Sequence, residues 1–171
     1  MGMTLIIIVI ALKFILPVLY LYFPFAAGWG NFVLDSVDGD ILIPAGLDNH
    51  LYQNIDKAAD WVAYLFMFIW GWRKPIRREI SAMFALRTVG QVIFFLTQNE
   101  IVFFWFPNFL EPLFLVYVTI AQFKGWERAQ EIYRRRIWLI WILIFIYKMQ
   151  DEYFTHVGNV DRTDLLRSLF P

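Results

Sequence analysis

Apolar residues gather in five stretches of the chain, separated by polar connections. The stretches cover residues 4–24, 58–72, 80–96, 107–123 and 137–154. A helix needs about 20 residues to cross a hydrocarbon core about 30 Å thick, and the first stretch is long enough to favour such a helix over a buried strand. The pattern predicts an all-α polytopic membrane protein, a five-helix transmembrane bundle that forms one domain over residues 1–171.

The connections are predicted from their turn residues and aromatic residues. Residues 25–56 contain several glycines, a proline and many Asp and Asn residues, which is typical of turns. We therefore expect an outer loop over 25–56, lying on the bundle or at the membrane interface. Residues 101–107 are predicted to form a tight aromatic hairpin, and residues 124–136 a short amphipathic helix on the inner side.

The charged residues are sorted by sign between alternate connections. Residues 73–78 and 124–136 together hold 9 of the 15 Lys and Arg residues. Acidic residues occupy the other connections and the C-terminal tail: Asp35, Asp38, Asp40, Asp48, Asp56, Glu100, Asp161 and Asp164. Short basic loops stay on the cytoplasmic side during insertion. We expect a multi-pass protein of the cell membrane with a cytoplasmic N-terminus and an outside C-terminus, although an organellar membrane fits the composition equally.

Composition supports the membrane class and limits the partners. Hydrophobic residues make up 60% of the chain and the mean hydropathy is +0.54, against about 45–50% apolar residues in soluble proteins. The absence of cysteine excludes disulfides and thiolate chemistry. Because the cations lie in short loops against the bilayer, the expected partners are membrane lipids, other membrane subunits or further copies of this chain, and not nucleic acid.

Ionisable residues inside the predicted spans form the candidate site. Such residues are costly in a bilayer and usually face protein or water, and helical spacing places several of them on shared faces. The intramembrane polar cluster consists of Arg87, Gln91, Glu111, Lys148, Asp151 and Glu152.

Two interpretations of this cluster remain open. In the first, the groups form structural ion pairs, with Arg87 against Glu111 and Lys148 against Asp151, Glu152 or Asp60. In the second, they line an outward-opening polar cavity that binds a head group, a cofactor or a small polar solute.

The acidic stretch Asp35–Asp40 contains the pattern Asp-x-x-Asp-Gly, which resembles the start of the CDP-alcohol phosphotransferase signature. We identify neither the downstream Ala-Arg nor the later pair of aspartates of that signature, and therefore reject the resemblance. The same oxygens suit Ca²⁺ by type, but the stretch lacks the loop pattern and closing Glu of an EF-hand. We interpret it as a solvated acidic turn.

Other motifs are equally sparse. Glu152 and His156 are four residues apart, which suits a shared metal, but the only other histidine, His50, lies in a distant segment. The sequence contains no nucleophile elbow, P-loop or dinucleotide fingerprint. We expect neither a metal nor a cofactor, and we assign no catalytic residue.

Three function classes follow from these observations. The first is a non-enzymatic subunit or assembly factor of a larger membrane complex, which small size and large apolar surfaces favour. The second is a small channel or transporter that uses the polar cluster, although internal repeats are lacking. The third is a lipid-modifying membrane enzyme with an acid or base among Glu111, Asp151, Glu152 and His156.

Overall fold

The computed structural model describes residues 2–157, and within this range 86% of the residues are helical and none form strands. The helices, in chain order, are α1 (Gly2–Ile15), η1 (Leu16–Leu21), α2 (Pro24–Leu42), α3 (Asn49–Gly71), α4 (Arg77–Thr97), α5 (Ile101–Trp105), α6 (Leu110–Lys124), α7 (Trp126–Arg135), α8 (Ile137–Glu152) and η2 (Tyr153–Val157). The predicted all-α class and helical bundle are therefore confirmed. The tail residues Asp161 and Asp164 lie outside the described residues.

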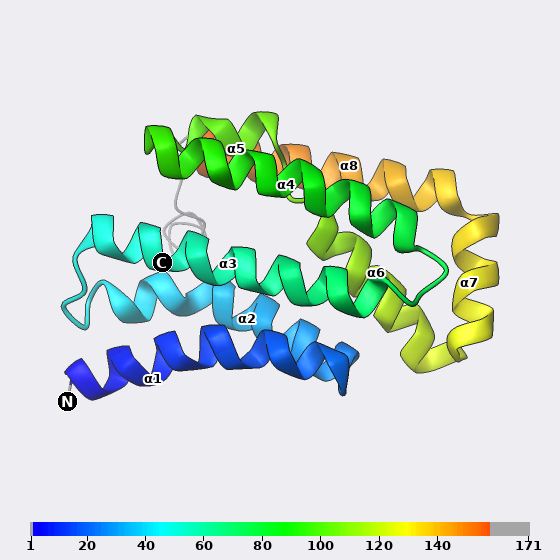
Figure 1. Cartoon of the computed structure of the whole chain (residues 1–171), viewed down its shortest axis with the longest axis horizontal. Helices are drawn as coiled ribbons and strands as arrows, with labels where there is room; N and C mark the ends of the chain where they lie inside the picture. The colour runs from blue at the N-terminus through cyan, green and yellow to red at the C-terminus, as the bar shows by residue number, and fades with distance from the viewer. Residues whose placement is uncertain (1, 158–171) are drawn as a thin grey trace, which may run out of the picture.

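Six long helices run back and forth along the bundle (Figure 1): α1, α2, α3, α4, α6 and α8. The shorter α7 lies across the right-hand end in Figure 1, between α6 and α8, where an amphipathic helix is predicted. The start of α1 and the end of α8 both lie at the left-hand end. A Cβ atom on Gly2 would lie 2.8 Å from the carbonyl oxygen of Ala45, so the N-terminus also lies beside the turn between α2 and α3.

The predicted outer loop over residues 25–56 is wrong, because most of this segment is helical. The chain reverses at Phe23, and α2 starts with Pro24, a residue that suits a first helical position because it needs no hydrogen-bond acceptor there. Gly28 then allows close packing, since a Cβ atom there would lie 2.7 Å from Cε1 of Phe114 on α6. Packing of α2 in the bundle thus overrides the weak helix propensity of its glycines.

The first predicted span divides into α1 and η1 at a proline. Pro17 lacks the amide hydrogen that would bond to the carbonyl of Lys13, and the α-helix changes to a 3₁₀-helix at Leu16. Tyr20 of η1 is fully buried and packs against Phe114, with ring centroids 5.1 Å apart. The change of helix type thus turns Tyr20 into the main hydrophobic core.

Two helical segments in the described range, Gly2–Leu21 and Arg77–Thr97, are long and apolar enough to cross a membrane. A five-helix transmembrane bundle is therefore not confirmed. The helices α6 and α8 have 15 and 16 residues, below the about 20 that a full span needs. The helices α2 and α3 are longer but carry several aspartates.

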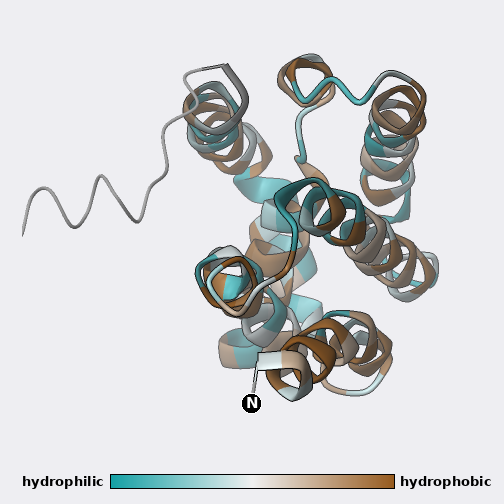
Figure 2. Cartoon of the chain, turned by 90° about the vertical axis from the view of Figure 1, so that its left-hand side faces the viewer, coloured by the Kyte–Doolittle hydropathy of each residue, from teal (hydrophilic) through white to brown (hydrophobic). Residues whose placement is uncertain are grey.

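The outside of the bundle is unusually apolar. Large hydrophobic side chains are exposed along α1, α4 and α8, and Trp138, Leu143 and Ile146 are 81%, 59% and 59% exposed. Figure 2 looks along the bundle from the left-hand end of Figure 1 and shows hydrophobic residues, in brown, on the helices seen end-on. Contiguous apolar surface of this kind marks contact with a membrane or with other proteins.

Candidate functional site: a polar cavity beside an apolar groove

A cavity of about 600 Å³ lies among α2, α3, α4, α6 and α8 and has mostly polar walls. Its charged lining residues are eight acidic ones and three basic ones. The acidic residues are Asp35, Asp38, Asp40, Asp56, Asp60, Glu111, Asp151 and Glu152, and the basic residues are Lys57, Arg87 and Lys148. The excess of carboxylates favours cationic ligands, and we call this space the polar cavity.

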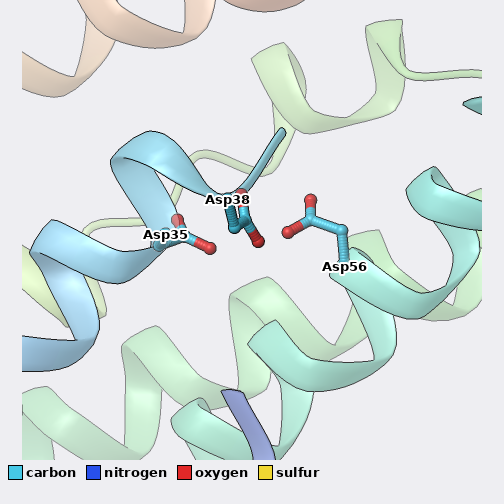
Figure 3. Close-up of side chains that lie close together, drawn as sticks. All are labelled: Asp35, Asp38 and Asp56. Carbon is cyan, nitrogen blue, oxygen red and sulfur yellow. The ribbon is translucent and has the colours of Figure 1, made fainter. Parts of the chain in front are cut away.

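Three aspartates from two helices meet at one wall of the polar cavity (Figure 3). Asp35 and Asp38 lie three residues apart on α2 and therefore share a face, while Asp56 reaches them from the first half of α3. One carboxylate oxygen from each lies within 4.8 Å of the other two. We call these residues the aspartate triad; oxygen ligands at this spacing suit a hard divalent cation.

The chain's own lysines contact the same carboxylates. The ammonium of Lys13 donates to Asp35 at 3.0 Å and also contacts Asp38 and Asp56. Lys57 donates to Asp56 at 2.7 Å and lies 3.8 Å from Asp60. The lysines neutralise part of the acidic charge, because burial of an unpaired charge is costly.

Local sequence explains how α2 and α3 present these aspartates. Asp48 caps α3 by accepting a hydrogen bond from the amide of Leu51 at 3.0 Å. This start places Asp56 and Asp60 one turn apart on α3, both on the polar cavity. Tyr52 donates to Asp38 at 2.9 Å and ties the first turns of α3 to the end of α2.

A second group of charges lines the facing wall. Arg87 of α4 lies 3.7 Å from Glu152 of α8, and Lys148 contacts both Asp151 and Glu152, the latter at 3.6 Å. The Arg87 guanidinium also donates to the carbonyl of Phe106 at 2.9 Å and lies over the ring of Phe103 at 4.2 Å. These contacts fix a buried guanidinium, whose planar donors suit phosphate or carboxylate groups.

Asn108 connects this wall to α3 and α6. Its backbone amide donates to Glu152 at 2.8 Å, and its side-chain amide donates to the hydroxyl of Tyr64 at 3.1 Å. The same side chain exchanges hydrogen bonds with Glu111, with the carboxylate at 3.2 Å and with the backbone amide at 3.2 Å. One residue therefore positions both Glu111 and Glu152.

Five of the six predicted cluster residues line the polar cavity, and Gln91 does not. Gln91 is only 1% exposed, and neither polar atom of its side-chain amide has a hydrogen-bond partner among the described residues. Lys148 pairs with Asp151 and Glu152 as the spacing predicts. The predicted pair of Arg87 with Glu111 is wrong, because Arg87 lies against Glu152 instead. The side chain of His156 lies outside the described residues, and with it the pair Glu152–His156.

The sequence predicts a solvated acidic turn over Asp35–Asp40 and not the aspartate triad, whose first two members lie in this stretch. Asp38 is in fact 0% exposed. The sequence does contain a signal for the triad. The resemblance to the phosphotransferase signature was rejected partly because no later pair of aspartates was identified, but Asp56 and Asp60 form such a pair, four residues apart. The later pair of aspartates is therefore present in this chain. The Ala-Arg of the signature is still missing after Gly39.

A narrower apolar groove of about 260 Å³ adjoins the polar cavity. Its floor is formed by α6 and its sides by α2 and α8, and within residues 2–157 Glu111 is the one charged residue that lines it. The lining residues are Trp29, Phe32, Glu111, Pro112, Leu115, Val116, Leu143, Ile144 and Tyr147. We call this space the apolar groove.

Comparison with known proteins finds no match for this chain among family models, curated proteins or solved structures. The geometry of the site is therefore the basis for any assignment of function.

Proposed function

We propose that this chain is an integral membrane enzyme that modifies lipids with phosphate-containing head groups. The observation that carries the proposal is the meeting of Asp35, Asp38 and Asp56 at a polar cavity whose facing wall holds Arg87 and Lys148. We prefer a lipid-modifying enzyme to an accessory subunit, because only the enzyme assigns a role to the buried charged residues.

The membrane setting is supported by the exposed apolar surface of α1, α4 and α8. With α2 counted as a helix, the basic connections lie at the end of the bundle opposite to the N-terminus. The positive-inside rule then places the basic end in the cytoplasm. On this proposal both the N-terminus and the end of α8 face outside, in place of the cytoplasmic N-terminus expected from the sequence.

The chemistry follows from the two walls of the polar cavity. The aspartate triad would hold a divalent cation such as Mg²⁺, which prefers carboxylate and phosphate oxygens, in the place that the Lys13 ammonium takes in this structure. Arg87 and Lys148 bind the phosphate oxygens, because charge-assisted bonds to phosphate are strong. Positioning and charge neutralisation of this kind are the main requirements of phosphoryl transfer.

The group transfer requires an acceptor hydroxyl and a base. Asp60 lines the polar cavity one turn beyond Asp56 and has a long ion pair with Lys57, at 3.8 Å. Asp60 takes the proton of the acceptor hydroxyl, whose oxygen attacks phosphorus. The bond from phosphorus to the leaving oxygen breaks, and the leaving group departs with the electron pair of that bond.

The aspartate pattern supports the same class of reaction. Asp35-x-x-Asp38-Gly39 resembles the start of the CDP-alcohol phosphotransferase signature, and Asp56 and Asp60 supply a later pair. Because the Ala-Arg of that signature is missing, we extend to this chain only the general class, transfer of a phosphate-linked group.

Lipid turnover in nanodiscs tests the proposal. The purified protein is placed in nanodiscs of a total phospholipid extract with Mg²⁺ and a mixture of small alcohols, and lipid classes are followed by mass spectrometry. We expect turnover by the wild type and by the control Glu127→Gln, whose residue is exposed on α7 and does not line the polar cavity. Turnover should be lost in Asp38→Asn and Asp56→Asn, and no turnover by any form would contradict an enzyme.

The accessory-subunit prediction is a second candidate, because the exposed apolar face of α8 also suits a protein partner. Native mass spectrometry after extraction in mild detergent tests it. A partner at fixed stoichiometry would support this candidate, and a lone monomer or homo-oligomer would overturn it. The transporter prediction is tested separately by flux measurements on Arg87→Ala.

A further inference from the structure

The apolar groove and the polar cavity lie next to each other and share part of their walls. Phe32 of α2, Glu111 of α6 and Tyr147 of α8 line both. A ligand that fills both spaces must therefore be polar at one end and apolar at the other. The two spaces meet at Glu111, the one charged residue among the described residues that line the groove.

We propose that the apolar groove holds a hydrocarbon chain of the lipid whose head group occupies the polar cavity. This inference rests on the proposed function and extends it, because it assigns a binding site for the apolar part of the substrate. The substrate class is then a phospholipid or another phosphate-bearing lipid with at least one long chain. The lipid enters sideways from the bilayer between α2 and α8.

The walls of the groove suit a hydrocarbon chain better than a peptide. Leu115 and Ile144 are 5% and 3% exposed and form buried walls, whereas Trp29 and Leu143 are 39% and 59% exposed at the rim. A peptide backbone in this groove would leave its amide and carbonyl groups without partners, at a cost that a hydrocarbon chain avoids.

The groove is built on fixed elements. Gly28 brings α2 against Phe114 and Leu115, where a Cβ atom would lie 2.7 Å and 3.2 Å from their side chains. The indole of Trp29 donates to the hydroxyl of Thr119 on α6 at 2.9 Å. These contacts hold the α2 wall beside α6, so the space is present before a lipid binds.

The groove opens onto surface that is itself apolar. Leu143 has exposed apolar neighbours on the same face of α8, namely Leu139 and Ile146. On the α2 side, Val33 is 58% exposed close to the rim residue Trp29. A hydrocarbon chain leaving the groove therefore continues into an apolar environment, as the lateral route requires.

Photo-crosslinking with a defined lipid tests the inference. The probe is phosphatidic acid with a diazirine on one acyl chain, added to the full chain in nanodiscs, and the crosslinked residues are identified by peptide mass spectrometry. Leu143→Trp fills the rim of the groove. Ile142→Trp is the matched control, because Ile142 is 54% exposed on the same helix and does not line the groove.

We expect crosslinks on α2 and α8 residues of the groove. They should be reduced about fivefold or more in Leu143→Trp, because the larger side chain takes up space that the hydrocarbon chain needs, and unchanged in Ile142→Trp. Crosslinks spread evenly over the apolar exterior, and equal in both variants, would overturn the inference. So would a peptide of another protein or of a second copy found in the groove.

The outcomes also separate this inference from the proposed function. Groove crosslinks without lipid turnover by the wild type would uphold the chain-binding site and contradict the enzyme. Turnover with unchanged KM in Leu143→Trp would uphold the enzyme and overturn the chain-binding site.

Discussion

Lys13 Nζ on α1 lies 3.0 Å from Asp35 Oδ1 on α2, and the same nitrogen contacts Asp38 and Asp56. A helix that is mostly apolar thus delivers one ammonium to the interior, where it is only 3% exposed. Each partner compensates the other, because either charge alone would be expensive to bury. Lys13 therefore joins α1 to α2 and α3 and occupies the carboxylates that we assign to a divalent cation.

Replacement of Lys13 tests both roles. Lys13→Met should destabilise the protein by about 3–5 kcal/mol, the cost of leaving buried charges without a partner. Mn²⁺ should restore part of this loss, since it can take the vacated place among the three carboxylates. Thermal unfolding in detergent, with and without Mn²⁺, measures the effect.

Lys148→Met is the matched control, because Lys148 is also buried but pairs with Asp151 and Glu152. Lys13→Gln serves if the Met variant does not fold. The assigned cation site would be contradicted if Mn²⁺ raised the Tm of the Lys13 variants by no more than it raises the Tm of Lys148→Met.

The observed partner of Arg87 gives a second prediction. In a double-mutant cycle, Arg87→Met and Glu152→Gln should be coupled by about 0.5–3 kcal/mol, the range for residues in contact. Arg87→Met and Glu111→Gln should show a smaller coupling, because Arg87 lies against Glu152 and Glu111 is held by Asn108. Stability in detergent measures both cycles, and a larger coupling to Glu111 would revive the pair expected from sequence.

Replacement by alanine is expected to have opposite effects on stability at two glycines of α2. Gly28→Ala should destabilise the protein by about 1–3 kcal/mol, since its methyl group overlaps Phe114. Gly30→Ala should stabilise it by about 0.4–1 kcal/mol, because the methyl group meets no atom within 4 Å and alanine restricts the unfolded chain. Equal effects at the two positions would argue against the packing of α2 on α6.

The proposed topology, with the N-terminus outside, can be tested by cysteine labelling. The chain has no cysteine of its own, so a single introduced cysteine is labelled specifically. Single cysteines at Met3 and Asn49 should react with an impermeant maleimide from outside, whereas a cysteine at Glu127 on α7 should react only after permeabilisation. The reason is that α1 and α3, which begin at Gly2 and Asn49, start at the same end of the bundle, whereas α7 lies at the other end (Figure 1). Labelling of Met3→Cys only from inside would restore the predicted cytoplasmic N-terminus.

Local pattern determined much of this protein before any tertiary contact was considered. Apolar stretches predicted the helical class, and the spacing of Lys148, Asp151 and Glu152 predicted their pairing, because residues three and four apart meet on one helix. The amphipathic pattern of residues 124–136 likewise indicated the helix α7. In each case the physical cause lies within a few turns of one helix.

Tertiary structure decided the rest. The glycines of α2 suggested turns, but packing against α6 makes them helical, since intrinsic propensities differ by only about 1 kcal/mol. Lys13 meets Asp56 across a separation of 43 residues, and Asn108 meets Glu152 across 44. Periodicity shows which face of a helix is polar, but not which other helix that face meets; only the packing of the bundle brought the aspartate triad together.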